Sequence, residues 1–470
     1  MDSWHSRRAT QITLVTLALL IGVVAGRLWL SQANLLITGV ALAAFAGLRF
    51  RLGLLVTLVF IFGIWRGNTT VFTHTPLGRE LGRTVTVTGI ISDDPAVNAK
   101  NQVSFTLGNV RLNGRAVHQN IQMLTNFKTL QRGYHIQATG KLELGLGSAP
   151  AAMGFAVTTV TSTHTSQLEQ FRQRFFTAMR AVLPEPLSGF GLGLLIGVRA
   201  LIDKSLQQTL NAVGLSHLIA VSGYNLTIII QAARRLVAPV STFMATATSL
   251  WLIFGFLLVA GFGASVVRAA IVSSLSLIVA YYGYEAKPIT LVALPALLTV
   301  AWRPDYLLQD VGWQLSFLAF FGIMVLAPLL QQRFVRRPTP IKLLVIESLA
   351  AQITTAPLIL ATFGNFSIIS PLSNAVILPM VPLAMLLSFG AGMAGIAVPV
   401  LAGWVALPAA GLLALMIGLV QWFASLPDAN LQLSATPVMI IGMYGLILLG
   451  TLVLWRGVAH PPQAPHKTNV

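Results

Sequence analysis

Residues Trp404–Leu426 read WVALPAAGLLALMIGLVQWFASL, a run of 23 residues without a charged side chain. A helix needs about 20 mainly apolar residues to cross a bilayer, so this stretch predicts a membrane span. The whole chain has the same character, with 55% hydrophobic and 9% charged residues and a mean hydropathy of +0.77. Soluble proteins carry about 25% charged residues. The 470 residues therefore predict a polytopic α-helical membrane protein and exclude a water-soluble globule.

Eleven further apolar segments give about twelve predicted spans. The first segment is expected to be retained, because two others follow at once and no signal-peptide cleavage pattern stands out. Gly189–Ile202 is glycine-rich and too short to cross, which favours a re-entrant segment. The predicted spans are 11–25, 33–48, 52–65, 215–232, 241–262, 265–284, 289–302, 313–330, 343–362, 371–389, 404–426 and 436–455.

The segment 76–165 has a different pattern, with polar and apolar residues alternating as they do in β-strands. Turn-forming Asp-Asp-Pro, Asn-Gly and glycine-rich stretches separate five short strands. Five strands suit a small OB-like β-barrel, a fold that often binds single-stranded nucleic acid. The five predicted strands are 84–88, 103–112, 120–124, 134–144 and 155–160.

This β-domain contains eight Lys or Arg residues against four Asp or Glu residues. A basic surface fits a polyanion such as DNA, but it fits anionic lipid headgroups or plain solvation equally well. Two interpretations are open for the aromatic residues Phe105, Phe127 and Tyr134. Their rings either stack on bases or are buried in the barrel core, and we favour burial for at least two of them. The predicted DNA-binding residues are Arg79, Arg83, Lys100, Arg111, Arg115, Lys128 and Arg132.

The segment 166–186 predicts an amphipathic helix in the membrane interface, ended by Pro184 and Pro186. Its apolar residues, at helical spacing, are Leu168, Phe171, Phe175, Met179 and Val182. The predicted domains are thus a three-span region (1–75), the β-domain (76–165), this helix (166–186), a nine-span domain (187–456) and a tail (457–470).

Positive charges predict the orientation, because Lys and Arg accumulate in cytoplasmic loops. With three spans before the β-domain and nine after it, the basic clusters all fall on one side. The β-domain is then outside, and both termini are cytoplasmic. The residues that set this orientation are Arg7, Arg8, Arg49, Arg51, Arg234, Arg235, Arg333, Arg336, Arg337, Lys342, Arg456 and Lys467.

Polar residues within the apolar half mark a candidate pathway, because ionisable groups in a bilayer are costly. The densest group is GLSHLIAVSGYN, Gly214–Asn225, with Ser216, His217, Ser222, Tyr224 and Asn225. Gly223 allows local unwinding toward a hydrated cavity. The competing interpretation is a close helix–helix contact through small residues, with His217 bonded to a neighbour.

Three more residues extend this candidate site. Arg268, near the start of a span, suits either a phosphate contact or a structural ion pair with Glu347 or Asp310. Asp310 and Gln314 lie at the start of another predicted span. The alternative interpretation of Asp310 is an ordinary loop residue.

Several chemistries find no support. The chain has no cysteine, which excludes disulfides, thiolate metal sites and a cysteine nucleophile. No HExxH, P-loop or dinucleotide motif occurs, so we expect no metal, cofactor or nucleotide hydrolysis. A serine protease is disfavoured, because His217 lies about 140° around a helix from Ser222.

Four motifs in order resemble the ComEC family of competence proteins. They are GLSHLIAVSG from Gly214, GASVVRAA from Gly263, DVGWQLSFLA from Asp310, and AQITTAP from Ala351 continuing through FGNFSIISPLSN from Phe363. The resemblance covers about 187–455, and the N-terminal spans and β-domain resemble that family's amino-terminal region. Two departures stand out. Many relatives have Ser-Gly-Leu-His where this chain has Ser222-Gly-Tyr-Asn225, and many carry a metallo-β-lactamase-like domain that we do not expect here.

The resemblance implies a bacterial cytoplasmic-membrane channel that imports single-stranded DNA during natural transformation. It further implies other competence proteins as partners, including a separate nuclease and a cytoplasmic ATPase, and leaves assembly into a homo-oligomer open. We expect a non-enzymatic channel with His217, Ser222, Tyr224, Asn225, Arg268, Asp310 and Gln314 as pathway or gate residues. The alternative is a secondary transporter of a small anionic or lipid-linked solute.

Overall fold

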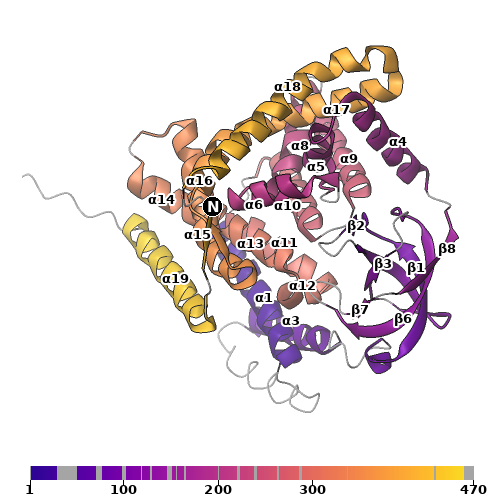
Figure 1. The fold of residues 1–470 in the computed structure, drawn as a ribbon. Coiled ribbons are helices and arrows are strands. Elements are labelled where there is room, and N and C mark those ends of the chain that lie inside the picture. The colour runs from indigo at the N-terminus through magenta and orange to yellow at the C-terminus, as the bar shows by residue number, and fades with distance from the viewer. Residues whose placement is uncertain are drawn as a thin grey trace, which may run out of the picture. The chain divides into compact units, whose positions relative to one another are not determined.

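The computed structural model consists of many helices and one group of strands (Figure 1), and the chain divides into two compact units. Unit 1 contains residues 1–203, 217–314 and 383–413, and unit 2 contains 204–216, 315–382 and 414–470. The structure describes residues 2–28, 50–69, 77–97, 102–117, 119–126, 130–145, 151–154, 156–163, 166–198, 201–219, 223–237, 241–261, 264–284, 288–335, 337–427, 430–433 and 435–459.

Helices make up most of both units. Those in unit 1 include α1 (Asp2–Leu28), α3 (Phe50–Thr69), α4 (Gln167–Val182), α5 (Leu187–Ile196), α8 (Gly223–Val237), α9 (Thr242–Ala260), α10 (Ala264–Tyr281), α11 (Pro288–Trp302) and α12 (Asp305–Gln309). Those in unit 2 include α6 (Lys204–Ala212), α14 (Ala327–Phe334), α15 (Pro340–Phe363), α16 (Ser370–Ile377) and α19 (Pro437–Ala459). Helices α7 (Ser216–Ile219), α13 (Val311–Phe321), α17 (Val381–Ala397) and α18 (Pro399–Ala424) have residues in both units.

Seven stretches of the described chain are long and apolar enough to cross a membrane, and they confirm a polytopic membrane protein. The predicted spans 52–65, 265–284 and 289–302 correspond to shorter apolar helices. The predicted span 215–232 contains α7 and the first part of α8, with 220–222 outside the described residues, and the predicted span 33–48 also lies outside them. The seven stretches are Thr10–Arg27, Thr242–Ala260, Val311–Phe334, Pro340–Phe363, Ser370–Ala397, Pro399–Ala424 and Pro437–Arg456.

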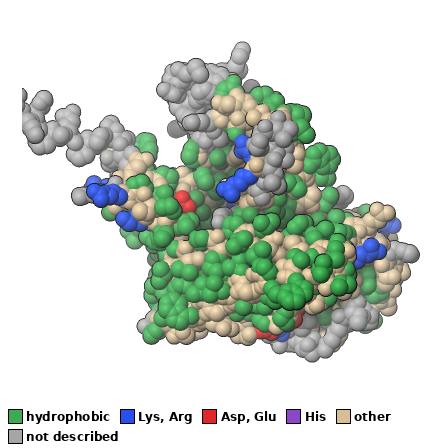
Figure 2. Space-filling model, turned by 90° about the horizontal axis from the view of Figure 1, so that it is seen from above, with side chains coloured by type: hydrophobic (Ala, Val, Ile, Leu, Met, Phe, Trp, Pro, Cys, Tyr) green, Lys and Arg blue, Asp and Glu red, His purple; other side chains and the backbone are tan. Residues whose placement is uncertain are grey.

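Large apolar side chains cover much of the surface of these helices. Trp404 is 75% exposed, and Val438 is 78% exposed. Figure 2 shows a face on which hydrophobic side chains predominate, with Lys and Arg gathered in a few places. Such a surface is stable against hydrocarbon and unfavourable in water, which agrees with membrane insertion.

Helices α1 and α3 pack through glycines four residues apart, Gly22 and Gly26 on α1 and Gly63 and Gly67 on α3. A Cβ on Gly26 would lie 2.2 Å from the Ile64 carbonyl oxygen, so only glycine permits this approach. Glycines at this spacing are typical of close helix pairs in membranes. Gly22 lies beside Gly63, and Gly67 lies beside Val23. The two helices are therefore parallel, as expected for the first and third spans.

The β-domain is a closed five-stranded barrel, as predicted. Its strands follow the order β1–β3–β5–β7–β6 and close by pairing β6 with β1, with β5 and β7 parallel. These strands are β1 (Thr84–Ile91), β3 (Val103–Leu112), β5 (Ile121–Thr125), β6 (His135–Leu144) and β7 (Ala151–Met153). The short strands β2 (Ala96–Val97) and β4 (Arg115–Ala116) pair with β3.

One predicted strand has a different role from the one expected. The stretch 155–160 corresponds to β8 (Val157–Ser162), which pairs with β6, while the three-residue strand β7 closes the barrel. The three residues of β7 are too few to show an alternating pattern in the sequence. Closure instead depends on the pairing of β7 with both β5 and β6.

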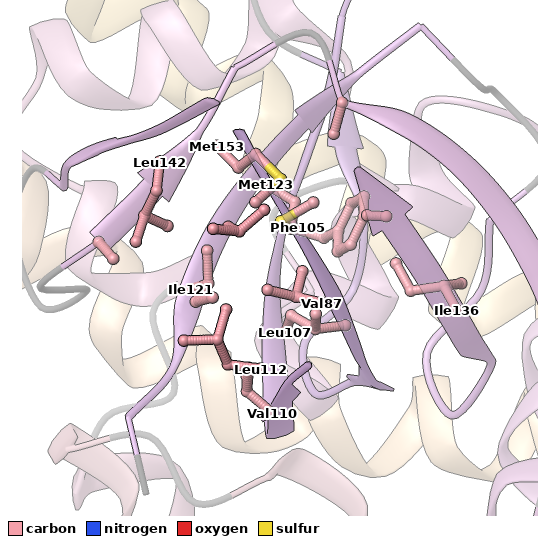
Figure 3. Packing of buried hydrophobic residues seen from close by; sticks show 14 of the residues in the cluster. Val87, Phe105, Leu107, Val110, Leu112, Ile121, Met123, Ile136, Leu142 and Met153 are labelled. Carbon is pink, nitrogen blue, oxygen red and sulfur yellow. The ribbon is translucent and has the colours of Figure 1, made fainter. Parts of the chain in front are cut away.

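Alternate residues of the strands fill the barrel (Figure 3). Phe105 is 2% exposed within a core that also contains Val87, Leu107, Ile121 and Met123. Tyr134 is partly buried and packs against the same core. The structure therefore excludes Phe105 from base stacking and assigns it to packing, while Phe127 lies outside the described residues.

Helix α4 forms where expected, and two residues of its predicted apolar stripe, Phe175 and Met179, are buried within the protein. Ser166 accepts a hydrogen bond from the Glu169 amide and caps its N-terminus. Leu168 and Phe171 are exposed, whereas Glu169, Arg172, Phe175, Phe176 and Met179 are buried. Because Phe175 packs on α17 beside Phe389 and Gly392, α4 rests on protein along this side.

The short helix α5 is buried along nearly its whole length. Ten residues span about 15 Å, which is half the thickness of the hydrocarbon core, so α5 is too short to cross, as predicted.

Candidate functional site

The first predicted motif begins at a sharp turn after α6. Gly214 has a φ of +75°, and a Cβ placed on it would lie 2.5 Å from Cβ and Oγ of Ser370. Glycine is therefore required here for both conformation and space. The turn leads into α7, where His217 is exposed.

The second half of this motif is only partly described. Helix α7 ends at Ile219 and α8 begins at Gly223, and residues 220–222 between them lie outside the described part of the chain. Ser222 lies outside the described residues. Tyr224 and Asn225 belong to the first turn of α8.

Arg268 lies on α10 and is 7% exposed. The neighbouring Ala269 and Ala270 pack with α8 and α9 in one apolar cluster. Arg268 is thus a buried cation among the helices that follow the first motif.

Asp310 and Gln314 bond within their own turn. Asp310 Oδ1 accepts a hydrogen bond from the Trp313 amide at 2.8 Å and caps α13. Gln314 Nε2 donates to the Leu307 carbonyl at 2.8 Å, and Trp313 Nε1 donates to Thr299 Oγ1 at 3.0 Å. These bonds fix the junction of α12 and α13, which supports the structural interpretation of Asp310.

Unit 2 contains a buried polar group that the sequence analysis did not select. It joins α15, α16 and the strand β9 (Asn365–Ser367), which pairs with β10 (Asn430–Gln432). We call it the Asn374 cluster, and it consists of Ser348, Gln352, Ser367, Ser370, Ser373 and Asn374.

Hydrogen bonds connect the Asn374 cluster to the turn at Gly214. Asn374 Nδ2 donates to Ser348 Oγ at 2.8 Å, and Ser373 Oγ donates to the Val213 carbonyl at 2.9 Å. Gln352 Oε1, Ser367 Oγ and Asn374 Oδ1 are buried and have no hydrogen-bond partner among the described residues. Buried polar atoms are ordinarily bonded, so these three oxygens are candidates for contact with water or a passing solute. The signal in the sequence was the recurrence of polar residues at Ser367, Ser370, Ser373 and Asn374, around the start of the predicted span 371–389.

The basic residues of the barrel divide between its two ends. Pairing of Thr84 with Lys141, and of Leu112 with Arg115, brings the start of β1 and the ends of β3 and β6 together. The exposed basic residues at this end, which we call the basic pole, are Arg79, Arg83, Arg111, Arg115 and Lys141. Arg83 pairs with Glu80 at 3.1 Å, and Lys100 and Lys128 lie outside the described residues.

The other end of the barrel contacts helices. Arg132 Nε lies 3.8 Å from Glu169 Oε2, and its Nη1 donates to the Val259 carbonyl at 3.3 Å. Arg132 thus differs from the residues of the basic pole, because it is partly buried and bound to two helices. Burial lowers the pKa of Arg132, and the nearby positive charge of Arg172 adds to this shift.

Two further charges at this end have shifted pKa values. Burial raises the pKa of Asp93, although the hydrogen bond from the Thr106 amide at 2.6 Å opposes it. Burial alone would lower the pKa of Arg172, but the hydrogen bond and charge of Asp94, followed by those of Glu169, raise it overall. Within the described residues, no group of three or more His, Asp or Glu side chains is arranged to hold a metal ion.

The apolar helices and the inserted barrel define a multi-span membrane protein with a separate β-domain. The model of the Competence protein family matches residues 194–458, more than half of the chain, and the chain belongs to that family. It is 27% identical over 210 residues to "ComE operon protein 3" of Bacillus subtilis (strain 168). These residues are 44% of this chain and 26% of that relative, so the match spans about a quarter of the relative's length. No solved structure matches the chain.

These findings confirm the prediction that the chain is a membrane protein of the competence family.

Proposed function

We propose that this protein passes one strand of incoming DNA across the bacterial cytoplasmic membrane during natural transformation. The observation that carries the proposal is the competence-family match over 194–458, the region that contains all four sequence motifs. A separate nuclease and a cytoplasmic ATPase are the partners that this role requires.

The barrel is the proposed receiver of DNA outside the membrane. Its basic pole presents five exposed Lys or Arg side chains, with Glu80 and Glu143 as the nearby acidic residues. Phosphates are attracted to such a surface without regard to base sequence. With Phe105 in the core, we expect binding through phosphates rather than by stacking on this ring.

Helix directions in unit 1 support the proposed orientation. Thr16 bonds to the Ala293 carbonyl, and Arg27 pairs with Asp305 at 3.4 Å, so α1 and α11 are parallel. The bond from Arg132 to Val259 brings the barrel to the C-terminal end of α9. In the predicted topology α1, α3, α9 and α11 all run outward, which agrees with these contacts.

The arginines support the same orientation. At the proposed outer ends of the helices, Arg66 donates to the Ala301 and Trp302 carbonyls, and Arg303 stacks on Tyr306. The proposed cytoplasmic residues Arg234, Arg235, Arg333, Arg337, Lys342 and Arg456 are exposed. Loops rich in exposed Lys and Arg favour the cytoplasmic side.

A hydrated passage is necessary, because phosphates in hydrocarbon are prohibitively unfavourable. We propose His217, Ser222, Tyr224, Asn225, Arg268, Asp310 and Gln314 as pathway or gate residues, and we add the Asn374 cluster. The three unsatisfied oxygens of that cluster support its contact with water.

Binding of single-stranded DNA to the purified full-length protein tests this function against transport of a small solute. Binding that weakens steeply as salt is raised is the expected result, because phosphate contacts release counterions. If no binding occurs even at low salt, the secondary-transporter alternative gains support.

A further inference from the structure

A buried ion network joins the barrel to α4. Arg172 of α4 is 2% exposed, and its Nη1 donates to Asp94 Oδ1 at 2.9 Å and to Glu169 Oε1 at 3.1 Å. Its Nη2 donates to Asp94 Oδ2, so the guanidinium binds this carboxylate in a bidentate manner through both terminal nitrogens. The guanidinium also lies 4.7 Å from the centre of the Phe176 ring.

The network continues to a third element. Glu169 Oε2 faces Arg132 of the barrel, and Arg132 donates to the Val259 carbonyl in the last turn of α9. Asp94 follows β1, and Arg132 precedes β6, so both lie at the barrel end opposite the basic pole. All of these residues belong to unit 1.

Such a network specifies a geometry more than it adds stability. Desolvating buried charges offsets most of their attraction, but removing one partner leaves a buried charge uncompensated. A two-pronged arginine–carboxylate contact also fixes the relative angle of the groups, which a lysine does not do. The Asp94 end of the barrel is therefore held in one orientation on α4 and α9.

We propose that Arg172 is a positioning residue for DNA entry, which fixes the barrel so that its basic pole stays free to receive DNA. The inference rests on the proposed function, since barrel orientation matters for transport only if the barrel receives the strand. Arg172 touches no DNA in this role and acts through Asp94, Glu169 and Arg132.

Distances between two spin labels test the positioning directly. The chain has no cysteine, so Gln137→Cys on β6 and Thr177→Cys on α4, both exposed positions, give one labelled pair in the full-length protein. We expect one narrow distance distribution, which Arg172→Gln broadens or shifts. Arg174→Gln removes an exposed charge from the same helix and should leave the distribution unchanged. An unchanged distribution in folded Arg172→Gln protein would overturn the proposal.

Transport supplies the second readout. Arg172→Gln should lower cytoplasmic arrival of DNA by roughly tenfold or more, because loss of one buried partner strongly disfavours docking. DNA binding by the purified Arg172→Gln variant should stay unchanged. Arg172→Lys should give a level of DNA arrival between those of wild type and Arg172→Gln. If Arg172→Gln does not accumulate, Asp94→Asn tests the same contact.

The outcomes separate the two proposals. If wild-type protein imports no DNA, the proposed function fails, while the label distances still decide whether Arg172 holds the barrel. If the distances broaden but arrival equals that of wild type, the positioning role is wrong and the proposed function stands.

Discussion

Gly214 shows how one residue without a side chain constrains the candidate site. Its φ of +75° is unfavourable for other residues, and its closest neighbours are Cβ and Oγ of Ser370. Gly214→Ala should therefore lower the melting temperature of the detergent-solubilised protein, with a cost of about 2–3 kcal/mol from strain and overlap. Gly283→Ala is the matched control, because Gly283 has a φ of +72° and nothing within 4 Å of its Cβ. Equal effects of the two substitutions would contradict the close contact with Ser370.

Also at the scale of single residues, a substitution of Phe105 tests whether this ring packs in the barrel core or stacks on bases. Its ring is enclosed by the barrel core, so Phe105→Ala should destabilise the barrel by about 3–5 kcal/mol. Thermal unfolding of the full-length protein measures this loss, and single-stranded DNA binding should decline only as the barrel unfolds. A variant that melts like wild type but no longer binds DNA would assign the ring to stacking instead.

At the scale of elements, the basic pole of the barrel makes a quantitative prediction. Arg111 and Arg115 are exposed at the β3–β4 hairpin. Replacing both with Gln should weaken single-stranded DNA binding and reduce the slope of log affinity against log salt by about 1.4, since each phosphate contact on a single strand contributes about 0.7. Arg174→Gln on α4 controls for the loss of an exposed arginine elsewhere. An unchanged slope would show that the phosphates bind another surface.

The sequence predicted these elements to different degrees. Four barrel strands followed from the alternation of apolar residues, because side chains of a strand point to opposite faces. Strand β7 could not be predicted, since its three residues depend on two partner strands. On α4, helical spacing predicted an apolar stripe, including Leu168 and Phe171, for the membrane interface. The observed burial of Arg172 depends instead on Asp94, a contact across 78 positions of the chain.

At the scale of the whole molecule, the orientation in the membrane is open to a direct test. Single cysteines in this cysteine-free chain report their side of the membrane through a membrane-impermeant maleimide. Thr159→Cys on β8 should react in intact spheroplasts, whereas Arg337→Cys should react only after permeabilisation. The opposite pattern would invert the proposed topology.

Composition and uncharged runs were enough to predict a polytopic membrane protein, because the bilayer demands long apolar helices. Motifs were needed to place the chain in its family. The candidate site was less predictable, because its contacts join distant segments. Asp310 and Gln314 were selected as polar residues at a span entrance, and the structure shows both bonded within a turn. Asn374 was not selected, although it lies within the quoted motif and bonds to Ser348, 26 positions away.

The central claim is that the protein carries a DNA strand to the cytoplasm, and cytoplasmic arrival of labelled DNA tests it most directly. Arrival is measured in cells that lack the gene and in the same cells after the wild-type gene is restored. We predict that deletion abolishes arrival while DNA still binds at the cell surface, and that restoration rescues it. Unchanged arrival in deleted cells that hold no second copy of the gene would contradict the account.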